Sequence, residues 1–509
     1  MPFRTLRADA PLAAIDIGSN SFRIEIGQLR QGRYRRLAYL KETVRLGGGL
    51  DAKGALTEEA AQRGLDCLSR FAERLRGFEP CQVRAVATQT LREATNRNAF
   101  LIRGEAALGF PIEVVSGREE ARLIYAGVSF LQPSSLPRLV IDIGGRSTEM
   151  ILGEGRIPKV AESFKVGSVS LSMRWFPDGR FTEQGFRSAQ IAAGAELEEA
   201  LTLFAPGLWQ QALGSSGTSG AVSQILAAAG ITDGTITPEG LRWCMAQCLQ
   251  AGDVSRLKLP SLREDRKAII GGGLSLLYTL ATHFGIQALQ PAKGALRQGV
   301  IIDLNERHEA SRQAAGVTDL RDHSVTGLQA RFDVDVKQAS RVRQLATRLY
   351  AQVAQELDID PEEASEALRE LGWACDLHEM GLMVSHHDHH RHSAYLLAHV
   401  DAAGFSQSQQ RRMADLVMGQ RGGLRKIEGP LTNERFVWHV LALRLAVIMC
   451  HARVSPDIDG LSLSREGRQA RLKCPASWSQ QQPRTLHLLH EEADTWARQG
   501  PLKLVLQLA

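Results

Sequence analysis

The sequence predicts an α/β protein with two similar halves, followed by a helical region and a small α/β appendage. The first observation behind this prediction is a strand–loop–strand segment that occurs twice, as AIDIGSNS at 14–21 and as VIDIGGRS at 140–147, each running on into a second apolar strand pattern. The second is the alternation of strand and helix patterns after each copy, which is typical of an α/β fold with a mixed sheet. The third is a change to an almost purely helical pattern after residue 325.

Each half begins with the pattern of a β-meander and continues with alternating helices and strands. In the first half, apolar runs over 12–46 are separated by Gly27 and by the turn 31–33, and Thr57 is placed as the N-cap of an amphipathic helix over 58–77. The elements expected next are a strand over 83–88, a helix to about residue 108, a strand over 111–115 and a helix that begins at Glu119. The second half restarts at about residue 137, with a helical stretch over 181–205, helices that open at the glycine-rich turns 214–218 and 269–273, and a closing segment at 294–299.

The character of the chain changes near residue 306. Residues 306–325 are polar and charged, which predicts a linker, and the pattern from 326 to about 455 is helical. Short apolar runs return over 470–509 and predict a small α/β unit. We therefore expect four domains, with the boundaries 1–127, 128–305, 315–470 and 471–509.

Composition places few limits on the function. Hydrophobic residues make up 44% of the chain and charged residues 23%, which is ordinary for a globular protein, and the net charge of +5 suits an anionic substrate without requiring one. Seven cysteines without a framework spacing predict a reducing compartment. We find no signal-peptide pattern and no apolar run of the ~20 residues that a membrane span needs, so we expect a cytoplasmic protein without an integral membrane segment, with peripheral membrane association left open. Dispersed basic residues and an aromatic content of 6% argue against a nucleic-acid partner.

The repeated loop predicts phosphate chemistry. A tight turn of small residues lets backbone N–H groups converge on an anion, and an Asp at the end of a strand can hold Mg²⁺ directly or through water. One such turn is weak evidence, because tight turns are common, but two copies that match at Ile, Asp, Ile, Gly and Ser are hard to dismiss. If the loops face each other, they can hold a phosphate chain from both sides. The candidate Mg²⁺ ligands are Asp16 and Asp142, with Glu149 as an outer partner.

Five strings in order along the chain carry a family resemblance: DIGSNS at 16–21, SGREEARLIYAGV at 116–128, VIDIGGRSTE at 140–149, GSSGT at 214–218 and GALRQG at 294–299. Together they resemble the exopolyphosphatase/guanosine pentaphosphate phosphatase family, in its long bacterial exopolyphosphatase form. The resemblance implies two actin-like (ribonuclease H-like) domains around a cleft, an all-α HD-like domain and the small C-terminal appendage. It also implies phosphoanhydride hydrolysis in the cleft. The residues expected to bind phosphate are Gly18, Ser19, Asn20, Ser21, Arg92, Gly144, Gly145, Arg146, Ser147, Thr148 and Gly217.

The Glu-Glu pair at the start of the third long helix supplies the candidate catalytic residues. A carboxylate there can accept a proton from an attacking water. The resemblance places the catalytic Glu on Glu120, with Glu119 as a partner of the metal or of the water. The alternative for both is stabilisation of the helix dipole alone. Arg92 suits a phosphate because arginine offers bidentate geometry, and its alternative is a solvated helix residue.

The chain departs from the family pattern at Arg146, where the family usually has a third glycine. Its side chain either enters the phosphate channel, adding a cation to the site, or turns away from the loop to solvent or to a carboxylate outside the site. The first option favours a long polyanion and crowds a bulky nucleotide. The second is structural tolerance.

The helical half resembles an HD-type phosphohydrolase domain with a degraded metal set. The His-Asp pair of that fold is replaced by His378 and Glu379, and the early His position by Asp333, although the segment 386–392 is rich in histidine. We interpret this half as a binding and dimerisation module, so a homodimer is expected.

The leading hypothesis is an exopolyphosphatase that releases terminal orthophosphate processively from inorganic polyphosphate. The expected groups for this reaction are a Glu general base and Mg²⁺, with a further monovalent cation such as K⁺ left open. The alternative within the family is hydrolysis of guanosine pentaphosphate to the tetraphosphate. Two hypotheses of other classes are a small-molecule kinase, against which the absence of an evident acceptor motif speaks, and a non-catalytic polyphosphate or alarmone sensor, against which the retained acidic residues speak.

Overall fold

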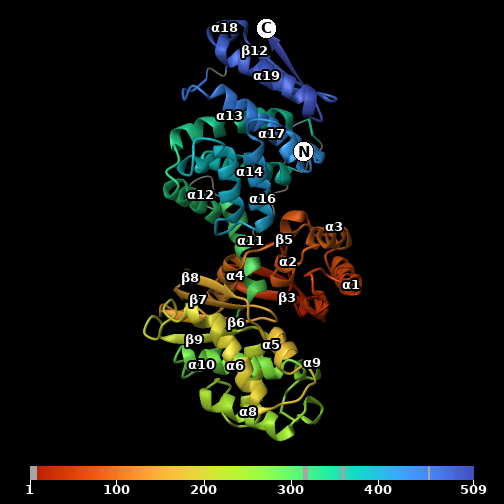
Figure 1. The fold of residues 1–509 in the computed structure, drawn as a ribbon, viewed down its shortest axis with the longest axis vertical. Helices are drawn as coiled ribbons and strands as arrows, with labels where there is room; N and C mark the ends of the chain where they lie inside the picture. The colour runs from red at the N-terminus through yellow and green to blue at the C-terminus, as the bar shows by residue number, and fades with distance from the viewer. Residues whose placement is uncertain (1–8, 313–318, 355, 358–360, 457–458, 509) are drawn as a thin grey trace. The chain divides into compact units, whose positions relative to one another are not determined.

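The structure is a computed structural model of the 509-residue chain. The chain divides into two units, and the boundary between them falls after residue 317 of the sequence. Each unit is described by itself (Figure 1). The residues that the structure describes are 9–312, 319–354, 356–357, 361–456 and 459–508.

The first unit contains two five-stranded sheets of the same topology. The first sheet has the order β3-β2-β1-β4-β5 and the second the order β10-β9-β6-β7-β8. In both, the first three strands along the chain form an antiparallel meander, the fourth pairs in parallel with the first, and the fifth pairs in parallel with the fourth. The strands of the first sheet are β1 (Leu12–Ile17), β2 (Ser21–Arg30), β3 (Arg33–Thr43), β4 (Val83–Ala87) and β5 (Ile112–Val114). Those of the second are β6 (Arg138–Ile143), β7 (Thr148–Glu154), β8 (Ile157–Phe164), β9 (Gln211–Ser215) and β10 (Leu289–Pro291). The predicted pair of similar halves is confirmed.

The likeness extends to an irregularity within the sheets. The register between the second and third strand shifts at Ile26/Gly27 in the first sheet and at Leu152/Gly153 in the second. Both glycines lie under an aromatic ring: a Cβ added at Gly27 would come within 2.6 Å of Tyr34, and one at Gly153 within 2.2 Å of Tyr125. The sequence alone suggested a break at Gly27, whereas the strand continues through it with a bulge.

Helices cover both faces of the first sheet. On one face, α1 (Glu58–Arg74) and α3 (Arg97–Leu108) pack on the strands and bury Phe22, Phe71 and Phe100 between them. As predicted, Thr57 caps α1, because its hydroxyl accepts a hydrogen bond from the amide of Ala60.

The other face of the first sheet shares a core with the second sheet. Helices α4 (Gly117–Leu131) and α11 (Leu296–Arg312) contribute to this core together with strand residues of both sheets, such as Val86 and Val140. The two helices pack closely, because a Cβ at Gly299 would lie 1.7 Å from the carbonyl oxygen of Leu123. The glycines at 294–299 therefore serve helix packing.

The outer face of the second sheet carries a further group of helices, which Figure 1 shows in yellow and green. Phe176, Phe181 and Phe186 form an aromatic cluster in the core beneath them. These helices are α5 (Ser168–Trp175), α6 (Glu183–Leu197), α7 (Ser216–Ala228), α8 (Pro238–Ala251), α9 (Glu264–Lys267) and α10 (Ile270–His283).

The linker predicted over 306–325 is wrong for the residues that the structure describes. Helix α11 continues to Arg312, and α12 begins at Leu320; residues 313–318 lie outside the described residues. The polar side chains that suggested a linker have partners within the fold: Arg307 binds Asp303 (2.8 Å), and His308 shares a hydrogen bond with the carbonyl of Cys81 (2.7 Å). A smaller difference concerns α4, which begins at Gly117 with Ser116 as its N-cap, not at Glu119.

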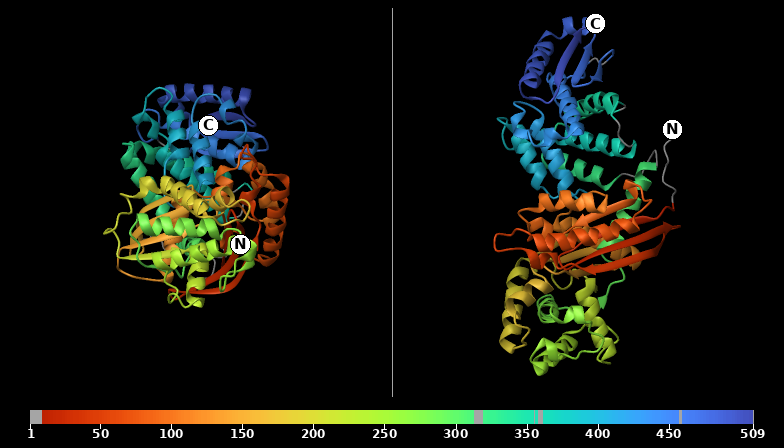
Figure 2. Two further views of the ribbon diagram at one scale, coloured as in Figure 1. Left: turned by 60° about the horizontal axis from the view of Figure 1, so that its bottom comes forward. Right: turned by 90° about the vertical axis from the view of Figure 1, so that its right-hand side faces the viewer.

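The second unit is helical and ends in a three-stranded sheet, all around one continuous core (Figure 2). The appendage predicted over 470–509 is present, but its sheet begins earlier, at Ser462. A buried ion pair between Arg444 and Glu492 (2.5 Å) ties the sheet's helix to the helices before it. The elements are α12 (Leu320–Arg331), α13 (Val336–Ala354), α14 (Pro361–Leu377), α15 (His389–His399), α16 (Gln407–Gly419), α17 (Glu434–Met449), β11 (Ser462–Glu466), β12 (Gln469–Cys474), α18 (Ala476–Gln481), α19 (Pro483–Gln499) and β13 (Lys503–Leu508).

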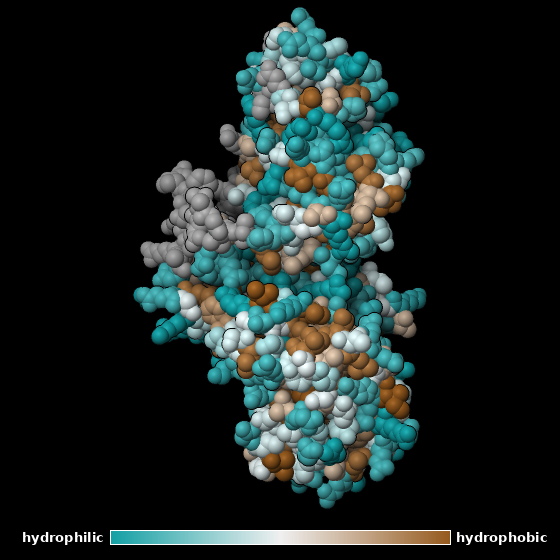
Figure 3. All heavy atoms as spheres, turned by 90° about the vertical axis from the view of Figure 1, so that its left-hand side faces the viewer, coloured by the Kyte–Doolittle hydropathy of each residue, from teal (hydrophilic) through white to brown (hydrophobic). Residues whose placement is uncertain are grey.

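The surface has the mixed character of a globular protein. On the face drawn in Figure 3, hydrophobic groups are scattered among hydrophilic ones. Within the residues that the structure describes, none of the helices combines the length and apolar character that a bilayer crossing requires.

Candidate active site

The structure brings the two copies of the loop face to face. The loop after β1 lies against the loop after β6: a Cβ added at Gly145 would be 3.5 Å from the Cβ of Ser19 and 3.7 Å from that of Asn20. The second loop is a tight turn, in which the amide of Gly144 donates to the carbonyl of Ser147 (2.9 Å). The tight approach to the second loop is made by Gly167, where a Cβ would lie 2.5 Å from the backbone nitrogen of Arg146, so that position requires a glycine.

Buried carboxylates gather around these loops. Asp16 and Asp142 are the penultimate residues of the strands β1 and β6, Glu149 lies on β7 and Glu120 on the first turn of α4; each is less than a tenth exposed. Burial raises the pKa of Asp142, and the negative charge of Asp16 adds to the rise. Burial and the charges of Glu120 and Asp142 raise the pKa of Glu149 well above its usual range. These groups therefore lie near enough to repel one another, and they create a region of negative charge that favours cations or protons.

Glu120 is balanced between burial and a single arginine. Burial raises the pKa of Glu120 to about 7, against the opposing effect of Arg92, while the charges of Asp16 and Asp142 add to the rise. Arg92 Nη1 donates to Glu120 Oε2 (2.6 Å) and to the carbonyl of Val115 (3.1 Å). Arg92, which was predicted to bind phosphate, thus lies on the candidate base. A carboxyl with a pKa near neutrality can take up and release a proton at physiological pH.

Glu119 is engaged elsewhere. Both of its carboxylate oxygens accept from Arg122 (2.8 Å each), which also binds Asp303 of α11 (2.5 Å). Arg84 on β4 binds the same aspartate (2.6 Å). The two glutamates that follow each other in the sequence therefore point into different surroundings: Glu120 into the acidic region at the loops, and Glu119 into an ion-pair network that joins α4 to α11.

The two loops differ in the charge opposite their aspartates. The hairpin register pairs Asp16 with Arg23 in the first sheet and Asp142 with Glu149 in the second. Arg23 donates to Asp16 (2.9 Å), and Arg297 lies 3.6 Å from the same carboxylate. The first aspartate thus has cationic neighbours, whereas the second faces another carboxylate.

The remaining predicted phosphate ligands have varied surroundings. Thr148 is buried and its hydroxyl donates to the carbonyl of Val166 (2.6 Å), and Ser19 accepts from Thr90 (2.8 Å). The Asn20 amide lies within 3.4 Å of the Ser21 hydroxyl. Gly18 lies between β1 and β2, and Gly144 and Gly145 lie between β6 and β7; their role in phosphate binding stays a prediction.

Arg146 does not point freely into a channel. Its guanidinium donates to Glu93 Oε2 through Nε (3.2 Å) and Nη2 (3.1 Å) and to the carbonyl of Gly47 through Nη1 (3.3 Å). Glu93 belongs to α2 (Gln89–Glu93) and Gly47 to the short 3₁₀ turn Leu46–Gly49, both in the first half. Of the two options left open by the sequence, this is the one in which the arginine pairs with a carboxylate.

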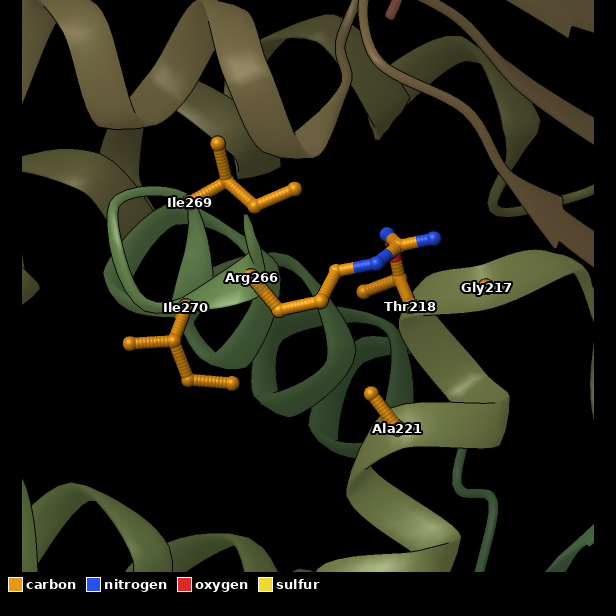
Figure 4. Close-up of a pocket in the computed structure, with 6 residues that line it drawn as sticks. All are labelled: Gly217, Thr218, Ala221, Arg266, Ile269 and Ile270. Atoms are coloured by element: carbon orange, nitrogen blue, oxygen red, sulfur yellow. The ribbon is translucent and has the colours of Figure 1, made fainter. Parts of the chain in front are cut away.

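The sequence analysis missed a group of cations near the two loops. Arg266 lies over Gly217 at the start of α7, so closely that a Cβ there would be 1.9 Å from its Nη2. Figure 4 shows this guanidinium reaching toward Gly217 and Thr218. Lys41 on β3 binds Asp265 of α9 (3.4 Å). Burial lowers the pKa of Lys41, with the charges of Arg266 and Arg23 adding to the effect, and burial likewise lowers the pKa of Arg266.

Only part of this cationic group had a signal in the sequence. Arg23 follows the first loop, and the register of the hairpin between β1 and β2 pairs it with Asp16. This neighbour of Asp16 can therefore be inferred from the hairpin register alone. Lys41 and Asp265 are 224 residues apart, and no local pattern links them.

The site carries the kind of donor set that suits Mg²⁺ together with a substrate. Within the residues that the structure describes, no three His, Cys, Asp or Glu side chains are arranged to hold a metal ion by themselves. Mg²⁺ commonly takes one or two carboxylates and completes its shell with water and substrate phosphates, and the buried oxygens of Asp142 and Asp16 fit that requirement.

The histidines of the helical unit differ in burial: His378, His389 and His390 are buried, whereas His386 and His387 of the histidine-rich segment are exposed. His378 shares a hydrogen bond with the carbonyl of Cys375 (2.6 Å), and Glu379 binds Arg453 (2.9 Å). Burial lowers the pKa of His389 and of His390 to about 4, so both rings are neutral at physiological pH.

Comparisons with known proteins give matches over nearly the whole chain. Residues 26–308 match the Ppx/GppA phosphatase family, and residues 320–493 match domain III of Ppx/GppA phosphatases. The chain is 35% identical to a guanosine-5'-triphosphate,3'-diphosphate pyrophosphatase of Photobacterium profundum over 97% of both chains. It is 36% identical to a protein of the same name from Vibrio vulnificus over 96% of both.

Solved structures support the fold. An exopolyphosphatase from Cytophaga hutchinsonii matches with a TM-score of 0.53 and 24% identity, over 58% of this chain and 98% of its own. The Ppx/GppA family member of Aquifex aeolicus matches with a TM-score of 0.50 and 22% identity, over 60% of this chain and 99% of its own. The chain is therefore a member of the Ppx/GppA phosphatase family, a phosphoanhydride hydrolase with two α/β halves of the same sheet topology and a helical domain.

Proposed function

We propose that the protein hydrolyses guanosine pentaphosphate, the 5'-triphosphate 3'-diphosphate, to the tetraphosphate and orthophosphate. The motifs alone placed inorganic polyphosphate first and this nucleotide second. Similarity over nearly the full length to proteins named guanosine-5'-triphosphate,3'-diphosphate pyrophosphatase favours the opposite order.

The observation that carries the proposal is the presence of both signs of charge beside the facing loops. Buried carboxylates, among them Glu120, lie near the cations Arg23, Lys41 and Arg266, and Arg23 itself binds Asp16 (2.9 Å). A substrate with two separate phosphate groups suits this arrangement, because one group can meet the loops while the other meets the cations. A hydrolase also needs a base next to the scissile bond, and Glu120 supplies a carboxyl that is ionisable near neutral pH.

The chain's residues have defined tasks in this proposal. The loop backbones at Gly18 and Gly144 orient the terminal phosphates, and the small residues around them exclude bulk water. Glu120 accepts a proton from the attacking water, and Arg92 holds the carboxylate in place. Asp16 and Asp142 would hold Mg²⁺. When bound, that ion neutralises charge on the phosphate oxygens.

Orthophosphate release from guanosine pentaphosphate and from long-chain polyphosphate, measured side by side, tests the proposal. We expect a higher kcat/KM for the nucleotide and the tetraphosphate as its only guanosine product on chromatography. A higher kcat/KM for polyphosphate would overturn the substrate assignment.

The cationic group provides a sharper test. Loss of a charged hydrogen-bond partner costs about 1.5–3 kcal/mol, or roughly 10- to 100-fold in affinity. Arg266→Gln should therefore raise KM for guanosine pentaphosphate by that order and affect GTP, which has no 3'-diphosphate, much less. Arg263→Gln is the matched control, since its side chain is 68% exposed and pairs with Asp265 at the surface. Equal effects of Arg266→Gln on the two nucleotides would contradict a role of this arginine at the 3'-diphosphate.

A further inference from the structure

A continuous series of hydrogen bonds connects Arg146 in the second loop with Glu120. Arg146 donates to Glu93 Oε2, and Gln89 Nε2 donates to the other oxygen of the same carboxylate (2.6 Å). Arg92 donates to Gln89 Oε1 through Nε (3.1 Å) and Nη2 (2.6 Å). The remaining nitrogen of Arg92, Nη1, donates to Glu120 Oε2 (2.6 Å). Each member thus uses separate atoms for the neighbour before it and the neighbour after it.

This series crosses between the two halves of the first unit. Arg146 belongs to the loop between β6 and β7, whereas Glu93, Gln89 and Arg92 all lie on α2, directly after β4 of the first sheet. The third hydrogen bond of Arg146, to the carbonyl of Gly47, also ends in the first half. The arginine therefore bridges the second loop to the first half of the unit.

The bridge depends on the long side chain of Arg146 and on the absence of a side chain at Gly47. A glycine at position 146, the residue that the family resemblance leads one to expect, has no side chain to reach Glu93. At position 47 the opposite holds: a Cβ there would lie 2.8 Å from Cδ of Arg146 and 3.0 Å from Oγ1 of Thr90. The side chain of Arg146 passes over this glycine, so the local chain leaves room for it.

We propose that Arg146 is a positioning residue for the catalytic base: its contact with Glu93 holds Gln89 and Arg92 in place, and Arg92 in turn fixes the orientation of the Glu120 carboxylate. The inference rests on the proposed function only in that Glu120 is the base. It goes further in coupling the approach of the two loops to the geometry of that base. When the second loop lies against the first half, Arg146 completes the series; without Arg146, Glu93 and Gln89 lose one of the contacts that hold them, and Arg92 is positioned less firmly against the carboxylate.

A double-mutant cycle between Arg146 and Glu93 tests this coupling. Displacement of a catalytic group by about 1 Å can cost up to 10²-fold in rate, so Arg146→Gly and Glu93→Ala should each lower kcat by roughly 10- to 100-fold. KM should change less than about twofold, because in a positioning role neither Arg146 nor Glu93 contacts the substrate. The double variant should be no slower than the slower single variant, since both changes break the same series. Arg146→Lys retains one donor and should recover part of the lost kcat.

Controls separate this effect from a loss of folding and from a failure of the proposed function. Arg103→Ala removes an exposed arginine that binds Glu58 by two hydrogen bonds in the same unit and should leave kcat unchanged. All variants should keep the thermal unfolding midpoint of the wild type within a few degrees. The cycle is run on whichever of guanosine pentaphosphate and polyphosphate the wild type turns over, so that inactivity on the nucleotide would contradict the proposed function alone. Additive losses in the double variant, or a rise in KM with unchanged kcat, would overturn the role of Arg146 as a positioning residue and favour direct contact with phosphate.

Discussion

Arg92→Gln should move the pH dependence of the reaction rather than simply lower its rate. In the structure Arg92 is the cation that opposes the effect of burial on Glu120, whose pKa lies at about 7. A hydrogen bond to a charged group contributes about 1.5–3 kcal/mol, and 1.36 kcal/mol corresponds to one pH unit. Removal of the guanidinium should therefore move the rising limb of the kcat/KM profile to higher pH by roughly one to two units.

The sign follows from the role of the base. Glu120 must be ionised to accept a proton, and a group with a raised pKa is protonated, and hence inactive, below it. At pH 7 about half of the wild-type carboxyl groups are ionised, and in the variant only about 1–10% would be, which lowers the rate about 5- to 50-fold. Above pH 9 most of this loss should disappear.

The assay is orthophosphate release over pH 5.5 to 9.5 at substrate concentrations far below KM, so that the profile reports the free enzyme. Arg92→Lys keeps a positive charge and should move the limb less than Arg92→Gln does. A variant whose rate is lower at every pH, with the limb in its wild-type position, would refute the reasoning and show that Arg92 acts on the substrate.

Three other changes have expected outcomes of their own. Glu120→Gln keeps the acceptor for Arg92 but removes the base, so turnover should fall roughly 10²- to 10⁴-fold while substrate binding, followed by calorimetry, persists. Asp142→Ala should abolish most Mg²⁺-dependent turnover and be partly rescued at higher Mg²⁺; full wild-type activity in the presence of a chelator would show that no divalent ion is required. In the second unit, Arg444→Met leaves Glu492 as a buried, unpaired charge and should lower the free energy of unfolding by about 3–5 kcal/mol in urea titrations. The double variant Arg444→Met with Glu492→Leu should recover most of this loss, which would confirm the buried charge as its cause. An unchanged unfolding midpoint in the single variant would exclude this cause.

The sequence predicted the duplicated core well because its signals are local. A strand, an Asp and a glycine-rich turn lie within a few residues of each other, so the second copy can be recognised from the first. The two sheets that contain these copies have the same strand order. The choice between Glu119 and Glu120 shows the limit. Adjacent residues on a helix point in directions about 100° apart, and only the packing of α4 against α11 decides which carboxylate meets the loops.

Contacts between distant parts of the chain were beyond the sequence. The partner of Arg146 lies 53 residues earlier, and the ion pair of Lys41 joins residues 224 positions apart. The linker predicted over 306–325 failed for a related reason. Charged residues such as Arg307 resemble a solvated segment until their buried partner, Asp303, is known, and a paired charge is compatible with a packed helix.

The unlike residues opposite the two loop aspartates give the site a direction. Arg23 faces Asp16 and Glu149 faces Asp142, so strands that are equivalent in topology present opposite charges to whatever lies between them. The resulting field runs from the first copy toward the second, and a bound molecule with unlike ends has two orientations of unequal energy. Two hairpins of the same topology therefore carry opposite charges at equivalent positions, and under the proposed function this difference favours one orientation of a nucleotide whose two phosphate groups are unlike.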